Sequence, residues 1–308
     1  MLAMRHLNSL LELSRSDVDR IFALAESLKG RSRRGERPPL LAGRVLTQVF
    51  EKPSLRTRLS FDAAMLQLGG GSVFLSAKEA GIGGRECVKD VARVIGGYSD
   101  VIALRTFSQQ LIDDFIRYSG VPVINGLSDV RHPCQALTDL FTMREVLGDV
   151  RGRKFVFVGD GNNVATSLAS ACALLDVPLT VCAPADYRMP AEFLAELKRQ
   201  FPQSQVEQTS DFRGALADAD IIYTDVWTSM GQEAEDATRR KVFGPYQVNA
   251  NLMKLAPPTA RFMHCLPAKR GQEVTDDVID GPQSIVFEQA DNRMHLAKGL
   301  LCWVLEVE

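Results

Sequence analysis

The segment at residues 50–58 carries hydroxyl and guanidinium groups at a spacing suited to binding a phosphate. Its polar residues include Ser54, Arg56, Thr57 and Arg58, and they closely follow an apolar run. At the start of a helix, free backbone N–H groups and arginine forks can surround a phosphate from several sides. A polar helix cap with exposed arginines would give the same short pattern. The segment therefore predicts either a phosphate site or a helix cap.

Two segments further along offer groups that could polarise a carbonyl oxygen. Arg105 ends an apolar run, and the sequence Arg-His-Pro-Cys-Gln follows at 131–135. Proline favours the first position of a helix, which places His132 near the N-cap and Gln135 in the first turn. Because a helix N-terminus disfavours a cationic imidazole, we expect His132 to be neutral and able to donate to a carbonyl oxygen. An N-capping histidine with no chemical role would show the same pattern.

A glycine-containing turn at 158–164 resembles a dinucleotide-binding fingerprint, so a nucleotide-dependent dehydrogenase is one alternative. Two features weaken it. Val164 stands at the third glycine position, and the next predicted strand ends in Cys-Ala-Pro at 182–184, without an acid for a ribose hydroxyl. The amides of Asn162 and Asn163 instead favour a carboxylate or a similar small polar group.

The second half of the chain adds three more reactive segments. Asp225 ends an apolar run and could pair with an ammonium group, and Ser229 and Met230 could belong to a mobile cover. Cys265 follows another apolar run, where a buried structural thiol is the alternative. Arg293 opens the last predicted helix, where a surface cap is the alternative. The four histidines and six cysteines lack H-x-x-x-H and C-x-x-C spacing, so we expect no metal site.

The elements that must position these groups alternate along the chain. Strands are predicted at 45–50, 72–75, 101–104, 121–124, 155–158, 179–182, 221–224, 262–264 and 285–287. Helices are predicted at 57–68, 86–98, 109–118, 163–175, 191–199 and 212–217, with further helices at 133–147 and 292–305. A capping box at Ser14 and Asp17 predicts a first helix that ends near Gly30. This alternation predicts an α/β fold of two doubly wound parallel-sheet domains, whose ligands lie at the carboxyl ends of the strands.

Length and composition narrow the class of protein. A chain of 308 residues is enough for about two domains. The chain has 36 basic and 38 acidic residues. It therefore lacks the excess of basic residues that is typical of nucleic-acid-binding proteins, and we exclude that class. No apolar run approaches the roughly 18 residues of a membrane span, and the N-terminus lacks a signal-peptide pattern. The six scattered cysteines predict reduced thiols and hence a cytoplasmic protein. From the charge balance and the lack of a long apolar run we expect no nucleic-acid and no membrane partner.

Together these segments resemble the aspartate/ornithine carbamoyltransferase family, over nearly the whole chain and in the family's order. Ser-x-Arg-Thr-Arg at 54–58 and His-Pro-x-Gln at 132–135 resemble its carbamoyl phosphate signatures. The segments 225–231 and 264–267 resemble the ornithine branch. An aspartate-specific member would be expected to carry a Pro-Leu-Pro-Arg type sequence at 265–268, where this chain has Cys-Leu-Pro-Ala.

The resemblance implies a reaction and a domain plan. The reaction is transfer of the carbamoyl group of carbamoyl phosphate to the δ-amine of L-ornithine, giving L-citrulline and phosphate without a cofactor. Residues 1–132 would bind carbamoyl phosphate with helix 292–308 packed back on them, 133–148 would link the domains, and 149–290 would bind ornithine. The active site would lie in the interdomain cleft. The catalytic unit would be a homotrimer, or a multiple of trimers, in which a neighbouring subunit contributes to each site.

The resemblance also assigns roles to individual residues. Those implied for the phosphate are Ser54, Arg56, Thr57 and Arg58. Those implied for the carbamoyl end are Arg105, His132 and Gln135, completed by Cys265, Leu266 and Arg293, with Arg105, His132 and Cys265 as the catalytic groups. Those implied for ornithine are Asn163, Asp225, Ser229 and Met230. The thiol of Cys265 would position ornithine rather than form a covalent intermediate, and the Leu266–Pro267 bond would be cis.

One position departs from the family pattern. Many members place a glutamine or histidine where Gly81 stands, and that side chain reaches the carbamoyl phosphate of a neighbouring subunit. The alternatives that stay open are a sister carbamoyltransferase acting on aspartate, putrescine or an acylated ornithine, the dehydrogenase above, and a catalytically silent homologue. The direction of the reaction, toward citrulline or back toward ornithine, also stays open.

Overall fold

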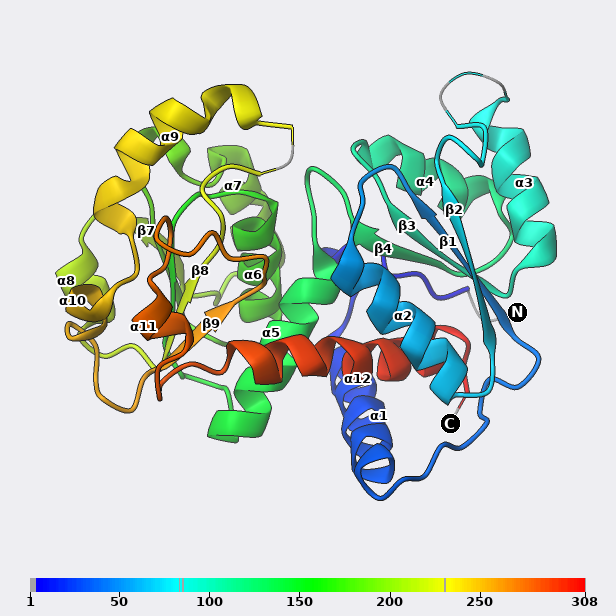
Figure 1. Ribbon diagram of the computed structural model, residues 1–308, viewed down its shortest axis with the longest axis horizontal. Coiled ribbons are helices and arrows are strands. Elements are labelled where there is room, and N and C mark those ends of the chain that lie inside the picture. The colour runs from blue at the N-terminus through cyan, green and yellow to red at the C-terminus, as the bar shows by residue number, and fades with distance from the viewer. Residues whose placement is uncertain (1–3, 83, 85, 230, 308) are drawn as a thin grey trace. The chain divides into compact units, whose positions relative to one another are not determined.

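The computed structural model describes residues 4–82, 84, 86–229 and 231–307 and contains two compact units. The first unit comprises Met1–Thr138 and Asp291–Glu308, and the second comprises Asp139–Ala290 (Figure 1). The helices α5 (Pro133–Leu147) and α12 (Val286–Val304) each contain a boundary between the units. Within the described part of the chain, no helix is both long enough and apolar enough to cross a membrane.

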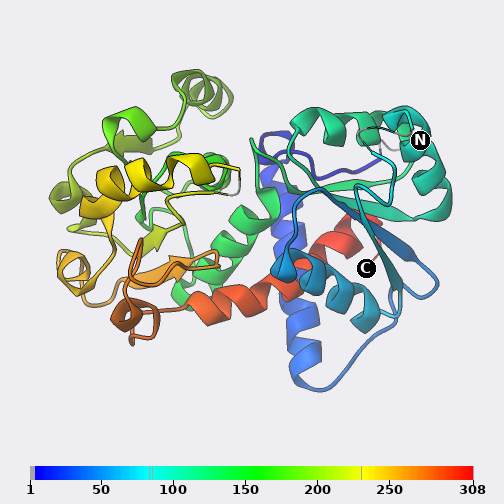
Figure 2. The same ribbon diagram turned by 45° about the horizontal axis from the view of Figure 1, so that its top comes forward.

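The first unit is built on a parallel sheet of four strands in the order β2-β1-β3-β4. The strands are β1 (Val45–Phe50), β2 (Gly71–Ser76), β3 (Val101–Arg105) and β4 (Val123–Leu127). The helices α3 (Val88–Tyr98) and α4 (Gln109–Tyr118) pack their apolar sides on one face. The helix α2 (Leu55–Gln67) covers the other face, with α12 beside it and α1 (Arg15–Arg33) crossing α12 (Figure 2).

The second unit has a parallel sheet of five strands in the order β7-β6-β5-β8-β9. The strands are β5 (Phe155–Val158), β6 (Leu179–Cys182), β7 (Val206–Thr209), β8 (Ile221–Thr224) and β9 (Arg261–His264). The helices are α6 (Asn163–Leu174), α7 (Ala191–Gln200), α8 (Phe212–Leu216), α9 (Asp236–Phe243), α10 (Ala250–Met253) and α11 (Asp276–Ile279). The two sheets confirm the expected α/β fold with two doubly wound parallel sheets.

Each sheet has a topological switch point, on either side of which successive strands are added in opposite directions across the sheet. In the first unit this switch point lies between β1 and β3, and in the second between β5 and β8. Helices that leave neighbouring strands on opposite sides of such a point open a crevice at the carboxyl ends, where ligands of open α/β sheets bind. Segment 50–58 begins at the last residue of β1, and Arg105 is the last residue of β3. The turn at 158–164 begins at the last residue of β5, and Asp225 directly follows β8.

Several element boundaries differ from the sequence-based expectation. The predicted strand at 285–287 is wrong, because pairing there stops at a single bridge between Phe262 and Ser284, and α12 begins at Val286. The capping box at Ser14 is confirmed, but Gly30 does not end α1, which continues to Arg33. The short, half-buried edge strand β7 was not expected. Its alternation of Val, Glu, Gln and Thr gives little apolar signal.

Candidate active site

The helix α2 begins at the carboxyl end of β1, and Ser54 is its N-cap. The Ser54 hydroxyl accepts a hydrogen bond from the Thr57 N–H at 3.2 Å and lies 3.0 Å from the Thr57 hydroxyl, to which it donates. The N–H groups of the first helical turn have no partner within the helix, and the helix dipole there is positive. The cap therefore forms at the expected place, and it lies at the switch point of the first sheet.

Arg293 joins three elements of the first unit at this place. Its Nη2 donates to the Thr57 hydroxyl on α2 at 3.1 Å, and its Nη1 donates to Oε1 of Gln135 on α5. All three side chains are buried. Segments that are far apart in the sequence thus place a hydroxyl and an amide against one guanidinium group.

His132 lies directly before α5, whose first residue is Pro133, and its carbonyl accepts from the N–H groups of Gln135 and Ala136. The imidazole is buried, and its pKa lies well below the usual value. Burial is the main cause, followed by the positive charges of Arg293, Arg105 and Arg56 in that order. The ring is therefore neutral, as expected, although burial and arginines dominate over the helix terminus. A neutral imidazole retains one N–H that can donate to a carbonyl oxygen.

The arginines of segment 50–58 go to different places. Arg56 is half-buried and acts on the His132 ring electrostatically, whereas Arg58 is half-exposed on the opposite side of α2. The Arg58 guanidinium lies 3.8 Å from the centroid of the Phe74 ring and 3.6 Å from an Asp62 oxygen. Successive residues of an α-helix are about 100° apart, so positions 56 and 58 cannot face the same way. The structure thus does not gather Arg58 with the other arginines.

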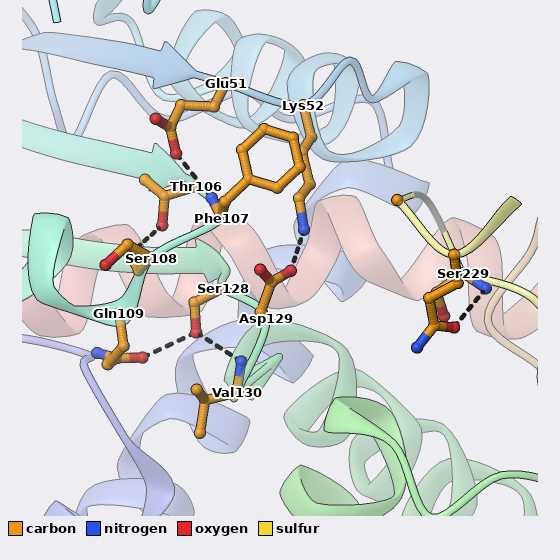
Figure 3. Close-up of polar contacts among 12 residues, drawn as sticks. Glu51, Lys52, Thr106, Phe107, Ser108, Gln109, Ser128, Asp129, Val130 and Ser229 are labelled. Carbon is orange, nitrogen blue, oxygen red and sulfur yellow. Dashed lines mark hydrogen bonds and ion pairs between the residues drawn. The ribbon is translucent and has the colours of Figure 1, made fainter. Parts of the chain in front are cut away.

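Lys52 is a buried cation at the same sheet edge, and sequence reasoning did not single it out. Its ammonium group forms an ion pair with Asp129, in the segment after β4, and lies 4.3 Å from the centroid of the Phe107 ring. The N–H of Phe107 in turn donates to Glu51 at 2.7 Å (Figure 3). The only indication of Lys52 in the sequence is its position within segment 50–58, which starts at the end of β1 and was predicted to bind a phosphate.

Asp225, at the end of β8, is the centre of the polar groups in the second unit. Its Oδ2 accepts from the Asn162 side-chain amide at 3.1 Å, and its Oδ1 accepts from the Val226 N–H at 2.8 Å. The Cys265 thiol lies 3.0 Å from the same Oδ1 and donates to it. The carboxylate is 7 % exposed, so it is desolvated but well supplied with donors.

The thiol of Cys265 is held in its protonated form. Burial raises the pKa of Cys265 well above its usual value, and the negative charge of Asp225 adds to the effect. The thiolate is the nucleophilic form of cysteine. The surroundings of Cys265 therefore favour a positioning role over covalent catalysis.

The turn after β9 is organised by the buried ring of His264. Its Nδ1 accepts from the Leu266 N–H at 2.9 Å, which leaves the proton on Nε2, 3.1 Å from Oε1 of the fully buried Glu273. The Leu266–Pro267 bond is cis, as expected, and Leu266 has a φ of 55°.

Potential ligand atoms of Asp225, His264 and Cys265 lie within 4.8 Å of one another. The Cys265 thiol already bonds Asp225, and the His264 ring already bonds Glu273 and the Leu266 N–H. We therefore assign these three side chains to a hydrogen-bond network rather than to a metal site.

Asn163 and Ser229, also expected near ornithine, follow β5 and β8 in the chain. Asn163 is the first residue of α6, while Asn162 caps that helix by accepting from the N–H groups of Val164 and Ala165. The Ser229 N–H lies 3.2 Å from Oε1 of Gln232, to which it donates (Figure 3). Met230 lies outside the described residues. Gly81 is buried with a φ of 74°, a backbone conformation that favours glycine, and it presents no side chain.

Arg239 is a second residue that sequence reasoning missed. It is 5 % exposed and extends from α9. Its Nη1 donates to Asp160, after β5, at 2.7 Å and to the carbonyl of Trp227, after β8, at 2.8 Å, while its Nε donates to Glu235. This side chain therefore ties the loop after β8 to the end of β5. No local pattern marks it, since its partners are distant in the sequence.

Comparison with known proteins agrees with this geometry. The family model "Aspartate/ornithine carbamoyltransferase, carbamoyl-P binding domain" matches residues 5–145, and "Aspartate/ornithine carbamoyltransferase, Asp/Orn binding domain" matches residues 151–304. The ornithine carbamoyltransferase of Methanopyrus kandleri is 47% identical, with 99% of this chain and 98% of that protein covered. That of Bacillus subtilis is 46% identical, with coverages of 98% and 94%.

A solved structure extends the likeness to three dimensions. The ornithine carbamoyltransferase of Pyrococcus furiosus has a TM-score of 0.95 at 44% identity, with 99% of this chain and 98% of that chain covered. The strand ends that carry the polar groups above are thus elements of a fold shared over the whole chain. The chain belongs to the aspartate/ornithine carbamoyltransferase family.

Proposed function

We propose that the protein transfers the carbamoyl group of carbamoyl phosphate to the δ-amine of L-ornithine, which gives L-citrulline and phosphate. The observation that carries the donor half is the contact of Arg293 with Thr57 and Gln135 beside a neutral His132. The acceptor half is supported by Asp225 and its partners, and by relatives at 44% to 47% identity that are named ornithine carbamoyltransferase.

The phosphate is assigned to the first unit. Ser54, Arg56 and Thr57 would bind it at the start of α2, with Arg293 opposite. Two guanidinium groups and free helix N–H groups match the charge and the paired oxygens of a phosphate dianion. Arg58 is left out, since its guanidinium lies over Phe74.

The carbamoyl carbonyl is assigned to Arg105, His132 and Gln135. As the amine attacks, negative charge develops on the carbonyl oxygen, where Arg105 and the neutral His132 ring would donate hydrogen bonds. The new C–N bond forms while the C–O bond to phosphate breaks, and the phosphate leaves as an anion stabilised by the arginines. The amine loses one proton in this step, to the leaving phosphate or to water.

Ornithine is assigned to the strand ends of the second unit. Asp225 would pair with an ammonium group, and Asn163, Ser229 and Met230 would complete that site. Cys265 and Leu266 follow β9, where the thiol bonds Asp225. The δ-amine must be neutral to attack, although its ordinary pKa is near that of lysine, about 10.4. Once the amine approaches the bound donor, the arginines that hold the donor would favour its neutral form.

The assembly is proposed to be a homotrimer or a multiple of trimers in the cytoplasm. The first unit leaves four large apolar side chains exposed on α2 and the edge strand β2, namely Leu55, Leu59, Leu66 and Val73. Large exposed apolar side chains that gather on one surface are typical of subunit interfaces, which favours an assembly. All six cysteines are free, which suits a reducing compartment. Sedimentation equilibrium measures the assembly directly, and a monomer would contradict it.

A panel of amines with carbamoyl phosphate tests the reaction. Ornithine, aspartate, putrescine and N-acetylornithine are compared by the ureido product that each forms. We expect citrulline from ornithine and at most trace products from the others. A preferred product from another amine would make the protein a sister carbamoyltransferase, and no product at all would make it a silent homologue.

A further inference from the structure

Helix α12 shows two different faces to the first unit. Asn292 and Gly299 are seven residues apart, close to two helical turns, and therefore lie on one face. Arg293 follows Asn292 and points about 100° away from it, toward α2 and α5. The rotation of α12 about its own axis therefore decides whether Arg293 reaches Thr57.

The face with Asn292 and Gly299 is fixed against α1. Nζ of Lys29, on α1, donates to Oδ1 of Asn292 at 2.5 Å, and both side chains are buried. At Gly299 an added Cβ would lie 2.5 Å from the Ile21 carbonyl oxygen and 2.8 Å from the Ala25 nitrogen. Only glycine permits this approach, so the backbones of α12 and α1 touch there.

A second buried lysine, Lys298, connects α12 to α1 and to α2. Nζ of Lys298 donates to the Ser32 hydroxyl on α1 at 2.7 Å and to Oε1 of Gln67 on α2 at 2.6 Å. Lys298 is 2 % exposed. Two lysines and one glycine thus fix the rotation of α12 through contacts that do not involve Arg293 itself.

We propose that Lys29 is a positioning residue for carbamoyl phosphate, which acts through Asn292 by setting the rotation of α12 and hence the reach of Arg293. The assignment rests on the proposed function for the identity of the ligand. An unbranched apolar side chain would fill the same space without the cost of desolvating an ammonium group. The hydrogen bond to Asn292 is a contribution that such an apolar side chain cannot make.

The test compares Lys29→Met with Lys29→Arg, which keeps a donor, and with Glu26→Met, an equivalent change at an exposed position of α1. Binding of phosphonoacetamide, an unreactive analogue of carbamoyl phosphate, is measured by calorimetry on the full-length protein. We expect Lys29→Met to weaken binding about tenfold, the loss expected for one hydrogen bond to a charged group. Lys29→Arg should recover most of the affinity, and Glu26→Met should match the wild type.

Steady-state kinetics separate positioning from general damage. In Lys29→Met the KM for carbamoyl phosphate should rise about tenfold, while the KM for ornithine and the circular dichroism spectrum stay at wild-type values. Equal phosphonoacetamide affinities in Lys29→Met and the wild type would overturn the proposal. A parallel loss for both substrates would also overturn it, because that outcome indicates only a weakened fold.

Two further arrangements keep the result decisive. If Lys29→Met fails to fold, the double variant Lys29→Met, Asn292→Leu replaces the polar pair by an apolar one, and it should fold while still binding phosphonoacetamide weakly. Wild-type affinity in that variant would contradict the role of the hydrogen bond. If the wild type binds phosphonoacetamide but makes no citrulline, the proposed function fails, and the affinity difference still decides the positioning role.

Discussion

Arg293 donates a hydrogen bond to Thr57, a residue 236 positions earlier in the chain, at 3.1 Å. The hydroxyl that receives it also receives a hydrogen bond from Ser54, the N-cap of α2. The start of one helix is therefore organised by a side chain from the last helix. A phosphate that binds at this N-terminus would meet a guanidinium already held in place, which lowers the entropic cost of binding.

Arg56 and Arg58 should differ strongly when each is replaced by alanine. Arg56→Ala should lower kcat/KM for carbamoyl phosphate by about 10²-fold, the loss typical of a donor to developing charge. Arg58→Ala should change it by less than about threefold, as surface substitutions usually do, because Arg58 packs on Phe74. Initial rates at varied concentrations of carbamoyl phosphate give kcat/KM for both variants. Equal losses of kcat/KM would mean that Arg58 also binds the phosphate.

His132 should make the stability of the fold depend on pH. Its folded-state pKa lies well below 6.5, the ordinary value that applies to the unfolded chain. Below pH 6.5 the unfolded chain therefore binds the additional proton, so stability is complete above that pH and falls as the pH drops. Urea unfolding from pH 5 to 8 should give a slope for the wild type that exceeds that of His132→Asn by up to about 1.4 kcal/mol per pH unit. Parallel slopes would mean that the ring is protonated in the folded state.

Cys265 should resist alkylation and form no covalent intermediate. The pKa of Cys265 is raised and the residue is only partly exposed, whereas Cys87 is exposed. Iodoacetamide at pH 8 should therefore label Cys87 and leave Cys265 unmodified, as peptide mass spectrometry would show. Cys265→Ala should still form citrulline, with the KM for ornithine raised about tenfold by loss of the hydrogen bond to Asp225. A carbamoyl-thioester on Cys265 after rapid quenching would refute this assignment.

Arg239→Lys should impair ornithine binding selectively. Nη1 of Arg239 bonds both Asp160 and the Trp227 carbonyl while Nε bonds Glu235, and the single nitrogen of a lysine cannot occupy both of these donor positions. The link between the loop after β8 and the end of β5 should therefore weaken. The KM for ornithine should rise about tenfold or more, while the KM for carbamoyl phosphate stays constant. The matched control is Arg240→Lys, because Arg240 is half-exposed and pairs with Asp236. Equal effects at the two positions would show that burial of Arg239 has no functional meaning.

The sequence was most informative where a local rule determines the structure. The capping box at Ser14 and the proline start of α5 were both predicted, because each depends on residues within one helical turn. The alternation of apolar strand patterns with helical patterns predicted both parallel sheets, because each pattern can be recognised within its own short segment. The group of polar residues at the strand ends followed from the rule that parallel strands bring their carboxyl ends to one edge.

Features that depend on distant partners could not be predicted in this way. Arg58 stands in a phosphate-binding pattern, but the direction of its side chain is decided by the rotation of α2 and by Phe74 on β2. Arg239 and Glu273 show nothing unusual in the sequence, since their burial depends on strands that the chain contributes elsewhere. The strand expected at 285–287 failed because a short apolar run is equally compatible with the first turn of a buried helix.

The two switch points have a consequence for how such an enzyme can change. The contacts among Thr57, Gln135 and Arg293 close within the first unit, and those of Asp225 and Cys265 close within the second. Each substrate is thus assigned to a group of residues whose described contacts lie within one unit. Substitutions in the loops after β5, β8 and β9, whether natural or engineered, can therefore change the specificity for the acceptor amine while the binding site for carbamoyl phosphate stays the same.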